Sequence, residues 1–235
     1  TDPELCKVSA NIRFKVYELE ETVLKNTTKK ERLIKLLNCK LYLITSPKKE
    51  LLKIVTSALD AGITMVQFRC KESNDLEKIT QAKELASLCK RKNSLLIIND
   101  RIDIALAVDA DGVHLGQNDL PTRYARELIG EDRLIGKSIN ERQQLKKAER
   151  DGCDYIGIGP TFPTKNKPHK KAIGINPVTE ISKETNLPYY AIGGINISTT
   201  RELGSNGINR IAVSSGIIDA LDPSSATHEL LNELQ

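Results

Sequence analysis

The chain has 235 residues, enough for one large α/β domain or two small ones. Its 35 basic and 31 acidic residues leave a formal net charge of +4, and aromatic residues make up only 4% of the sequence. This near balance of charge, without a Lys/Arg-rich tract, does not favour a nucleic-acid partner. No apolar run approaches the roughly 18 residues that a membrane-spanning helix needs, so we expect no membrane partner either.

The five cysteines indicate a reducing compartment. They are odd in number, widely spaced and lack a C-x-x-C pair, which argues against both a disulfide framework and a zinc site. The first residues include Asp2 and Glu4 and lack an apolar core, so they do not resemble a secretory signal. We therefore expect a cytoplasmic protein, while the sequence leaves open whether an organelle transit peptide has been removed.

Residues 1–39 are expected to be helical and separate from a domain at 40–235. Apolar residues recur here at helical spacing, at Val16, Leu19, Val23 and Leu24. The motif Thr28-x-x-Glu31 is typical of a capping box and predicts the start of a second helix. The segment is therefore expected to be a helical hairpin or a helical extension that covers the main domain or contacts another copy in a possible homo-oligomer.

From residue 40 onward, strand and helix patterns alternate. The eight predicted strands are 41–45, 64–68, 95–98, 113–115, 134–138, 154–159, 189–192 and 209–214. Helix-start signals follow them at Ser46-Pro47, Asn74-x-x-Glu77, Pro121, Asn140, Asn176-Pro177 and Ser198, and residues 217–234 are expected to be largely helical. Eight strand–helix units favour a (β/α)8 TIM barrel. An open doubly wound sheet is the alternative, but no G-x-G-x-x-G follows the first strand.

Acidic residues follow the third and fourth predicted strands, and the stretch 97–119 that carries them organises the site. Asp100 comes just after one strand with Asn99 before it, and Asp119 follows the other within a short turn. Parallel strands joined by a helix place their carboxyl ends at one edge of the sheet. One or two carboxylates, several waters and substrate phosphates are the usual ligands of Mg²⁺. The sequence therefore predicts a magnesium site.

The second strand leads into a cationic segment, Gln67-x-Arg69-x-Lys71. Alternation along an extended chain points these three side chains to one side. Two cations beside a metal ion are what a diphosphate requires, so this segment is expected to bind one.

The remaining strand ends carry hydroxyls and glycines. Ser138 follows the fifth strand, and residues 160–174 form a polar segment whose length is typical of a functional lid. Gly193-Gly194 and Ser214-Ser215 follow the last two strands, where many barrels bind a phosphate through backbone N–H groups. His114, inside a strand, is interpreted as a hydrogen-bonded core residue, and Cys70 as a packing residue; His169 and His228 receive no role.

Six motifs in order make the chain from residue 41 to its end resemble the thiamine phosphate synthase family. They are G-x-T-x-x-Q-x-R-x-K at 62–71, I-N-D-R-x-D-x-A-L-A at 98–107, A-D-G-V-H-L-G-Q-x-D at 110–119, G-x-G-P-x-F-P-T-x-x-K at 157–167, A-I-G-G-I at 191–195 and I-A-V-x-S at 211–215. The resemblance implies the same barrel and a transferase that joins hydroxymethylpyrimidine diphosphate to hydroxyethylthiazole phosphate, releasing diphosphate.

The resemblance also implies roles for individual residues. Asp100 and Asp119 would hold Mg²⁺. The diphosphate would be bound by Arg69, Lys71, Asn99 and Lys167. The pyrimidine would meet Gln67 and Ser138, and the thiazole phosphate would meet Thr164, Asn166, Gly194, Ser214 and Ser215. Arg69, Lys71, Ser138 and Lys167 would carry the chemistry.

Three places depart from the family pattern, and two other functions compete. Lys137 and Ile139-Asn140 flank Ser138 where small residues and His are commoner. Asn166 stands where a second Thr is usual, so thiazole phosphate binding is expected to be altered, and Ser214 adds a hydroxyl where an aliphatic residue is usual. A thiazole tautomerase-like isomerase or a non-catalytic thiazole phosphate-binding protein would need only the phosphate side of the site. Neither would need the diphosphate-binding residues, so a magnesium-assisted synthase is the expected function.

Overall fold

The computed structural model describes residues 3–164 and 171–234, with backbone alone for residues 3–10. Eight parallel strands close into a barrel in chain order: β1 (Leu41–Ile44), β2 (Met65–Phe68), β3 (Leu95–Asn99), β4 (Gly112–Leu115), β5 (Leu134–Ile139), β6 (Tyr155–Ile158), β7 (Tyr189–Ile192) and β8 (Ile211–Val213). The last strand pairs with the first, with Leu43 opposite Val213. The predicted TIM barrel is confirmed, and the doubly wound sheet is excluded.

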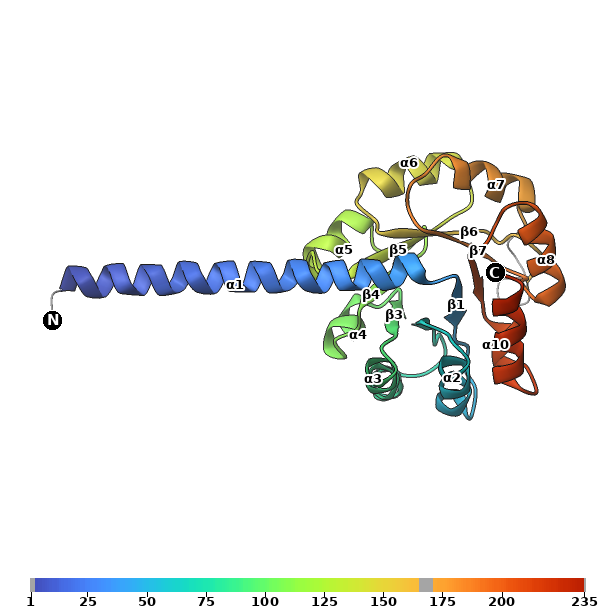
Figure 1. Cartoon of the computed structure of the whole chain (residues 1–235), viewed down its shortest axis with the longest axis horizontal. Coiled ribbons are helices and arrows are strands. Elements are labelled where there is room, and N and C mark those ends of the chain that lie inside the picture. Colours follow the sequence, from blue (N-terminus) through green and yellow to red (C-terminus); the bar gives the residue numbers. More distant parts are fainter. Residues whose placement is uncertain (1–2, 165–170, 235) are drawn as a thin grey trace.

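Helices surround the barrel as an outer layer (Figure 1). They are α2 (Leu51–Asp60), α3 (Asp75–Arg91), α4 (Ile102–Ala107), α5 (Thr122–Ile129), α6 (Arg142–Arg150), α7 (Ile175–Lys183), α8 (Ile197–Ser205), α9 (Ser215–Ile218) and α10 (Pro223–Asn232). Their apolar faces and the outward side chains of the strands form one large buried cluster. The strands are therefore covered on both faces, which explains their nearly continuous apolar sequences.

Helix starts were predicted with mixed success. Asn74 caps α3 as expected, because its side chain accepts a hydrogen bond of 2.9 Å from the Glu77 N–H. The start at Pro47 is wrong: the chain stays paired with β2 at Thr45, and α2 begins only at Leu51. The Asn140 cap is also wrong, since α6 begins at Arg142 after Glu141. The expected helix at 217–234 is divided into α9 and α10.

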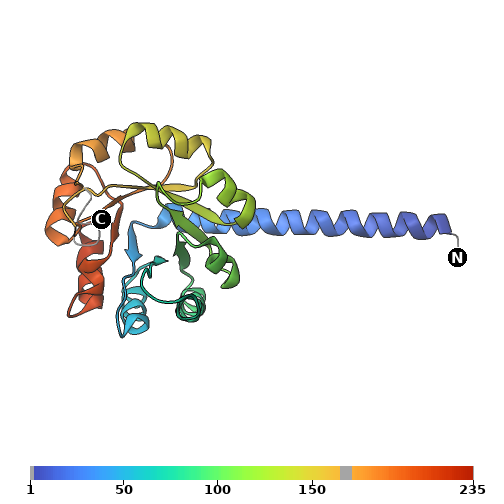
Figure 2. The same cartoon turned by 180° about the vertical axis from the view of Figure 1, so that it is seen from behind.

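The N-terminal segment is one helix, α1 (Pro3–Asn38), of 36 residues. The helical extension is therefore present, but the hairpin and the capping box at Thr28 are wrong. The Thr28 hydroxyl donates a hydrogen bond of 3.0 Å to the Leu24 carbonyl one turn earlier, so it bonds within a continuous helix and caps nothing. The N-terminal part of α1 projects well beyond the barrel, as both views show (Figures 1 and 2).

The C-terminal part of α1 closes the barrel at the end where the strands begin. Leu36 is fully buried in an inner cluster that includes Tyr42, Tyr155 and Tyr190. Arg210 donates to the Cys39 carbonyl at 2.7 Å, and thereby ties the end of α1 to the start of β8. The opposite end of the barrel stays available for a site.

Ion pairs attach the same part of α1 to the barrel rim. Arg32 bonds to Asp111 at 2.9 Å and to Asp132 at 3.0 Å, and Lys29 bonds to Asp154 at 2.6 Å. These side chains are all largely buried, so they fix the helix to the loops that precede β4, β5 and β6.

Within the described residues, no helix has the length and apolar character needed to cross a membrane.

Candidate active site

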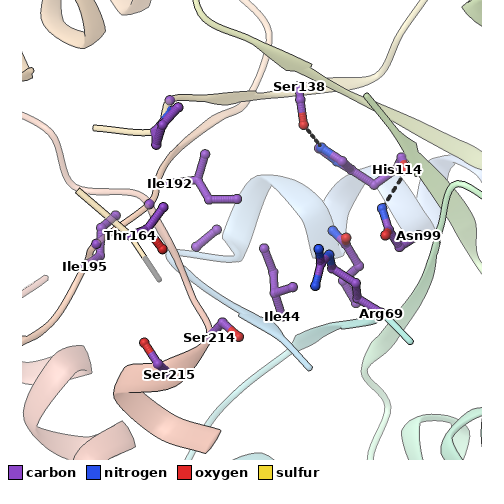
Figure 3. Close-up of a pocket in the computed structure, with 16 residues that line it drawn as sticks. Ile44, Arg69, Asn99, His114, Ser138, Thr164, Ile192, Ile195, Ser214 and Ser215 are labelled. Atoms are coloured by element: carbon purple, nitrogen blue, oxygen red, sulfur yellow. Dashed lines mark hydrogen bonds between the residues drawn. The ribbon is translucent and has the colours of Figure 1, made fainter. Parts of the chain in front are cut away.

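Two adjoining cavities open at the carboxyl ends of the strands. The larger encloses about 890 Å³, including its open mouth, and the smaller about 480 Å³. They share Arg69, Asn99 and Ser138, so a molecule spanning both would pass these three side chains. Figure 3 shows the larger cavity, with Arg69, Asn99, His114 and Ser138 on one side and Thr164, Ser214 and Ser215 on the other.

A chain of buried hydrogen bonds crosses the barrel beneath the larger cavity. The Gln67 amide donates to the Tyr42 hydroxyl at 2.6 Å, and this hydroxyl lies 3.0 Å from that of Tyr155. His114 continues the chain, with Nδ1 at 3.2 Å from the Tyr155 hydroxyl and Nε2 at 2.9 Å from the Ser138 Oγ. Burial raises the pKa of both tyrosines, so their hydroxyls stay protonated. This series of hydrogen bonds fixes Gln67 and Ser138 on opposite walls of the larger cavity.

His114 is thus the buried, hydrogen-bonded histidine that the sequence predicted, at 5% exposure. It also lines the cavity and holds Ser138, a position that its placement within a strand did not reveal. Cys70 packs against the outer core, as expected.

The first carboxylate of the smaller cavity is held in an unusual backbone conformation. Asp100 has a φ of 63°, in the left-handed region that residues other than glycine, asparagine and aspartate rarely adopt. Its Oδ1 accepts a hydrogen bond of 2.7 Å from Asn99, and its Oδ2 lies 2.6 Å from the Lys71 ammonium. This bend after β3 directs the carboxylate into the cavity beside the predicted cations. Backbone strain of this kind is concentrated at functional sites.

The second carboxylate is positioned by the turn that follows β4. The Gly116 N–H donates to Asp119 Oδ2 at 2.6 Å. The turn is fixed to β5 at two points, because Lys137 Nζ donates to the Gly116 carbonyl at 2.7 Å and Gln117 donates to the Ser138 carbonyl at 2.6 Å. Burial lowers the pKa of Lys137. Through its hydrogen bond to the Gly116 carbonyl, Lys137 fixes the turn from inside the barrel wall.

The two carboxylates titrate as a pair. Burial, followed by contact with Asp119, raises the pKa of Asp100. Burial also acts to raise the pKa of Asp119, but contact with Asp100, the Gly116 N–H and the nearby Lys71 and Lys137 outweigh it and lower that pKa. Each carboxylate therefore affects the pKa of the other, and both line the smaller cavity, where they could bind one cation.

The donor set of the smaller cavity suits a hard divalent cation. Its lining combines the two carboxylates with the amide side chains of Asn99, Gln117 and Asn118. No group of three or more His, Cys, Asp or Glu side chains in the described chain could enclose a metal ion. Two carboxylates suit Mg²⁺, which keeps several waters and takes substrate phosphates as further ligands. The Lys71 ammonium at Asp100 shows that a positive charge is accommodated there.

The opposite corner of the larger cavity is built from two loops that approach each other closely. Gly193 and Gly194 have φ values of 98° and 65°, and a Cβ on Gly194 would lie 2.5 Å from the Pro163 carbonyl oxygen. Backbone hydrogen bonds join the segment after β6 to this loop, from Thr161 to the Ile192 carbonyl at 2.7 Å and from Phe162 to that of Gly193 at 3.0 Å. Only glycine fits this crossing without displacing the loop.

Ser214 and Ser215 complete this corner. The Ser214 Oγ is buried without a hydrogen-bond partner, and its residue lines the cavity with Ser215 and Gly194. A buried hydroxyl without a partner is costly, and a ligand oxygen placed in this corner would remove the cost. The corner therefore fits a small anion.

The cavities bring together the predicted site residues that the structure describes. These are Gln67, Arg69, Lys71, Asn99, Asp100, Asp119, Ser138, Thr164, Gly194, Ser214 and Ser215. Asn166, Lys167 and the middle of the proposed lid lie outside the described residues. Sequence reasoning missed the apolar walls, which include Ile44, Ile192, Ile195 and Ala212. Ile44 and Ile192 end their strands, and that position alone could have indicated them.

Comparisons with known proteins show which family the chain resembles. The sequence model described as thiamine monophosphate synthase matches residues 41–217. The thiamine-phosphate synthase of Prochlorococcus marinus (strain MIT 9313) is 52% identical over 239 residues, which cover 100% of this chain and 68% of that protein. The thiamine-phosphate synthase of Thermosynechococcus vestitus is 43% identical over 100% of this chain and 66% of its own length. The chain therefore spans about two thirds of these relatives.

Solved structures give the same result. Thiamine phosphate pyrophosphorylase from Pyrococcus furiosus superimposes with a TM-score of 0.76 at 37% identity, over 83% of this chain and 95% of that one. A 3-hexulose-6-phosphate synthase superimposes with a TM-score of 0.62 at 14% identity, over 83% of this chain and 100% of that one, which shows the shared barrel fold alone.

Proposed function

The chain belongs to the thiamine monophosphate synthase family, and from this we propose that it joins hydroxymethylpyrimidine diphosphate to hydroxyethylthiazole phosphate. The products are thiamine phosphate and diphosphate. The observation that carries the proposal is the pair of adjoining cavities that share Arg69, Asn99 and Ser138. One cavity has the charge for a diphosphate, and the other has apolar walls against which two heterocycles could pack.

The smaller cavity would bind the diphosphate together with Mg²⁺. Asp100 and Asp119 would hold the ion, which when bound supplies positive charge to the leaving oxygens. Arg69 and Lys71 add two cationic donors, and Asn99 adds an amide at the boundary with the larger cavity. Lys71 now pairs with Asp100 and is 58% exposed, so its ammonium can turn to a phosphate once that carboxylate has another partner. Lys167 is proposed to join this set.

The larger cavity would hold both rings in line for reaction. Gln67 and Ser138, fixed by the buried hydrogen-bond chain, would orient the pyrimidine. The thiazole phosphate would occupy the corner of Gly194, Ser214 and Ser215, where the unpartnered Ser214 hydroxyl can donate to it. Thr164 and Asn166 are proposed to contact the same phosphate. The diphosphate would anchor the pyrimidine at its reacting bond and the remote phosphate would anchor the thiazole, which leaves little freedom at the reacting atoms.

The reaction would proceed by dissociative substitution. The bond between the pyrimidine methylene carbon and the diphosphate oxygen breaks, and the electron pair leaves with the oxygen. Arg69 and Lys71 stabilise the negative charge where it develops. The electron-rich pyrimidine stabilises the carbocation, and the thiazole nitrogen then supplies the pair for the new C–N bond. No strong base is required, which agrees with a site whose only histidine side chain in the described lining, His114, is buried beside Ser138.

An isomerase or a phosphate-binding protein explains less of the site. Either would use the corner of Gly194 and Ser214, but neither would need a cavity that gathers Arg69, Lys71 and the carboxylate pair. The free thiols of Cys39, Cys70, Cys89 and Cys153 are also consistent with activity in a reducing, cytosol-like compartment.

Product formation from the two substrates tests the proposal. Thiamine phosphate and diphosphate are expected in equal amounts when both substrates and Mg²⁺ are present, and excess EDTA should stop the reaction until Mg²⁺ is restored. Absence of product from the folded protein with both substrates and Mg²⁺ present would refute the synthase function. Undiminished turnover in EDTA would refute only the metal assignment.

A further inference from the structure

We propose that residues 12–23 of α1 form a parallel two-stranded coiled coil with the same segment of a second copy of this chain. The proposal concerns assembly and is independent of the proposed function. Residues 11–27 are all exposed, although α1 remains helical throughout this range. From Pro3 to Thr27 the helix spans about 37 Å beyond its first ion pair at Lys29. Most helical stability in proteins comes from packing of an apolar face, and the apolar side chains of residues 11–27 pack against nothing in the described part of this chain.

The exposed side chains form a heptad seam. Ile12, Val16, Leu19 and Val23 are 58%, 47%, 65% and 62% exposed, respectively, and follow one another at spacings of four, three and four residues. In a heptad written a to g, the two valines occupy a positions, and Ile12 and Leu19 occupy d positions. Valine at a with leucine at d, as at Val16, Leu19 and Val23, favours two-stranded parallel coils.

The flanking charges are complementary in a parallel pair. With this register, Lys15 occupies a g position and Glu20 the following e position. In a parallel dimer, each g residue faces the e residue five positions later on the other helix, so Lys15 of one copy meets Glu20 of its partner, twice by symmetry. Asn26 takes the next d position and would face its own copy, where two amides can bond to each other. Each of these contacts requires a second copy of the same sequence.

The assembly leaves both candidate active sites open. The last part of α1 closes the barrel at the starts of the strands, whereas the cavities open at their carboxyl ends. Figures 1 and 2 show that the projecting part of α1 lies beyond the barrel. Dimerisation through residues 12–23 is therefore expected to leave catalysis unchanged.

Sedimentation velocity over a range of protein concentrations tests the seam. The full chain is expected to dimerise, and Leu19→Glu should raise the dimer dissociation constant at least roughly tenfold, because two carboxylates would meet in the seam. Phe14→Glu is the matched control, since Phe14 is 64% exposed but lies on the opposite side of the helix. Circular dichroism and the enzyme assay verify that both variants keep the barrel. A wild-type chain that stays monomeric, or equal effects of both variants, would overturn the proposal.

Charge exchange and cross-linking test the orientation. Lys15→Glu should weaken the dimer and Lys15→Glu with Glu20→Lys should restore it. Val16→Cys should form an oxidised dimer above the wild-type background, because identical a positions meet in a parallel coil. Failure of both the restoration and the cross-link in a chain that still dimerises would overturn the parallel arrangement.

Discussion

Replacing Asp100 by asparagine separates the charge of this carboxylate from its shape. Asparagine is among the residues that best tolerate the φ of 63° at this position, so the substitution keeps the bend after β3. It also keeps an oxygen that can accept the hydrogen bond of 2.7 Å from Asn99. What it removes is the negative charge that pairs with Lys71 at 2.6 Å and, on our proposal, binds Mg²⁺.

The expected effect on activity is large. Removing one preorganised electrostatic contribution to a developing charge typically costs about 10²–10³ in rate. We therefore expect Asp100→Asn to lower kcat by roughly 10²–10³ at saturating substrates. The assay is thiamine phosphate formation at fixed Mg²⁺, with Asp103→Asn as the control. Asp103 is a nearby exposed carboxylate paired with Arg101 at 2.8 Å, outside both cavities.

Asp100→Asn should leave the stability of the fold unchanged or raise it, although it lowers the activity. Burial raises the pKa of Asp100 in the folded protein, so its charged form destabilises the fold at every pH above that raised pKa. Asparagine removes this cost, and the variant without Mg²⁺ should melt at the same or a higher temperature than the wild type at pH 7. Any gain should fade as the pH falls through the raised pKa of Asp100 and should be absent below about 4, where the carboxyl is protonated in both states. A variant that retains activity within about threefold, or that loses it only because it unfolds, would refute the reasoning.

Four further predictions concern the same site and the end of the barrel. Ser214→Ala should raise the KM for thiazole phosphate while leaving the melting temperature unchanged or higher, because it deletes a buried hydroxyl that has no partner in the free protein; an unchanged KM would argue against the phosphate corner. Gly194→Ala should lower kcat/KM by about 10²-fold, since its Cβ would displace the loop at Pro163, and full activity in steady-state assays would contradict this. Leu36→Ala should reduce the free energy of unfolding by about 2–5 kcal/mol in denaturant titrations, whereas Leu37→Ala, 53% exposed, should change it by less than about 0.5 kcal/mol. At limiting Mg²⁺, kcat/KM should fall as the pH drops through the raised pKa of Asp100, and excess Mg²⁺ should move this loss to lower pH; a profile insensitive to Mg²⁺ would count against the metal site.

The barrel and the contents of its mouth were predictable because both depend on local sequence periodicity. Each strand has an apolar run, and a polar residue such as Asn99 or Ser138 marks where it ends. Parallel closure then brings all the carboxyl ends to one rim, so the composition of the rim can be read from the strand ends alone. The predicted residues that the structure describes line the two cavities for this reason.

Features that depend on contacts between distant segments were not predictable. The hairpin expected in residues 1–39 was inferred from a local cap at Thr28, but the helix continues because its next turn docks on the barrel through Arg32 and Leu36. The role of His114 in holding Ser138 likewise depends on the register of β4 against β5, which places His114 opposite Gly136. No pattern within a single strand contains that information.

The most direct test of the central claim is calorimetric titration of hydroxymethylpyrimidine diphosphate into the full chain with and without Mg²⁺, without the second substrate. If Asp100 and Asp119 bind the ion that binds the diphosphate, Mg²⁺ should tighten binding at least roughly tenfold, and Asp119→Asn should abolish that gain. Equal affinity with and without Mg²⁺ in the wild-type protein would contradict the account.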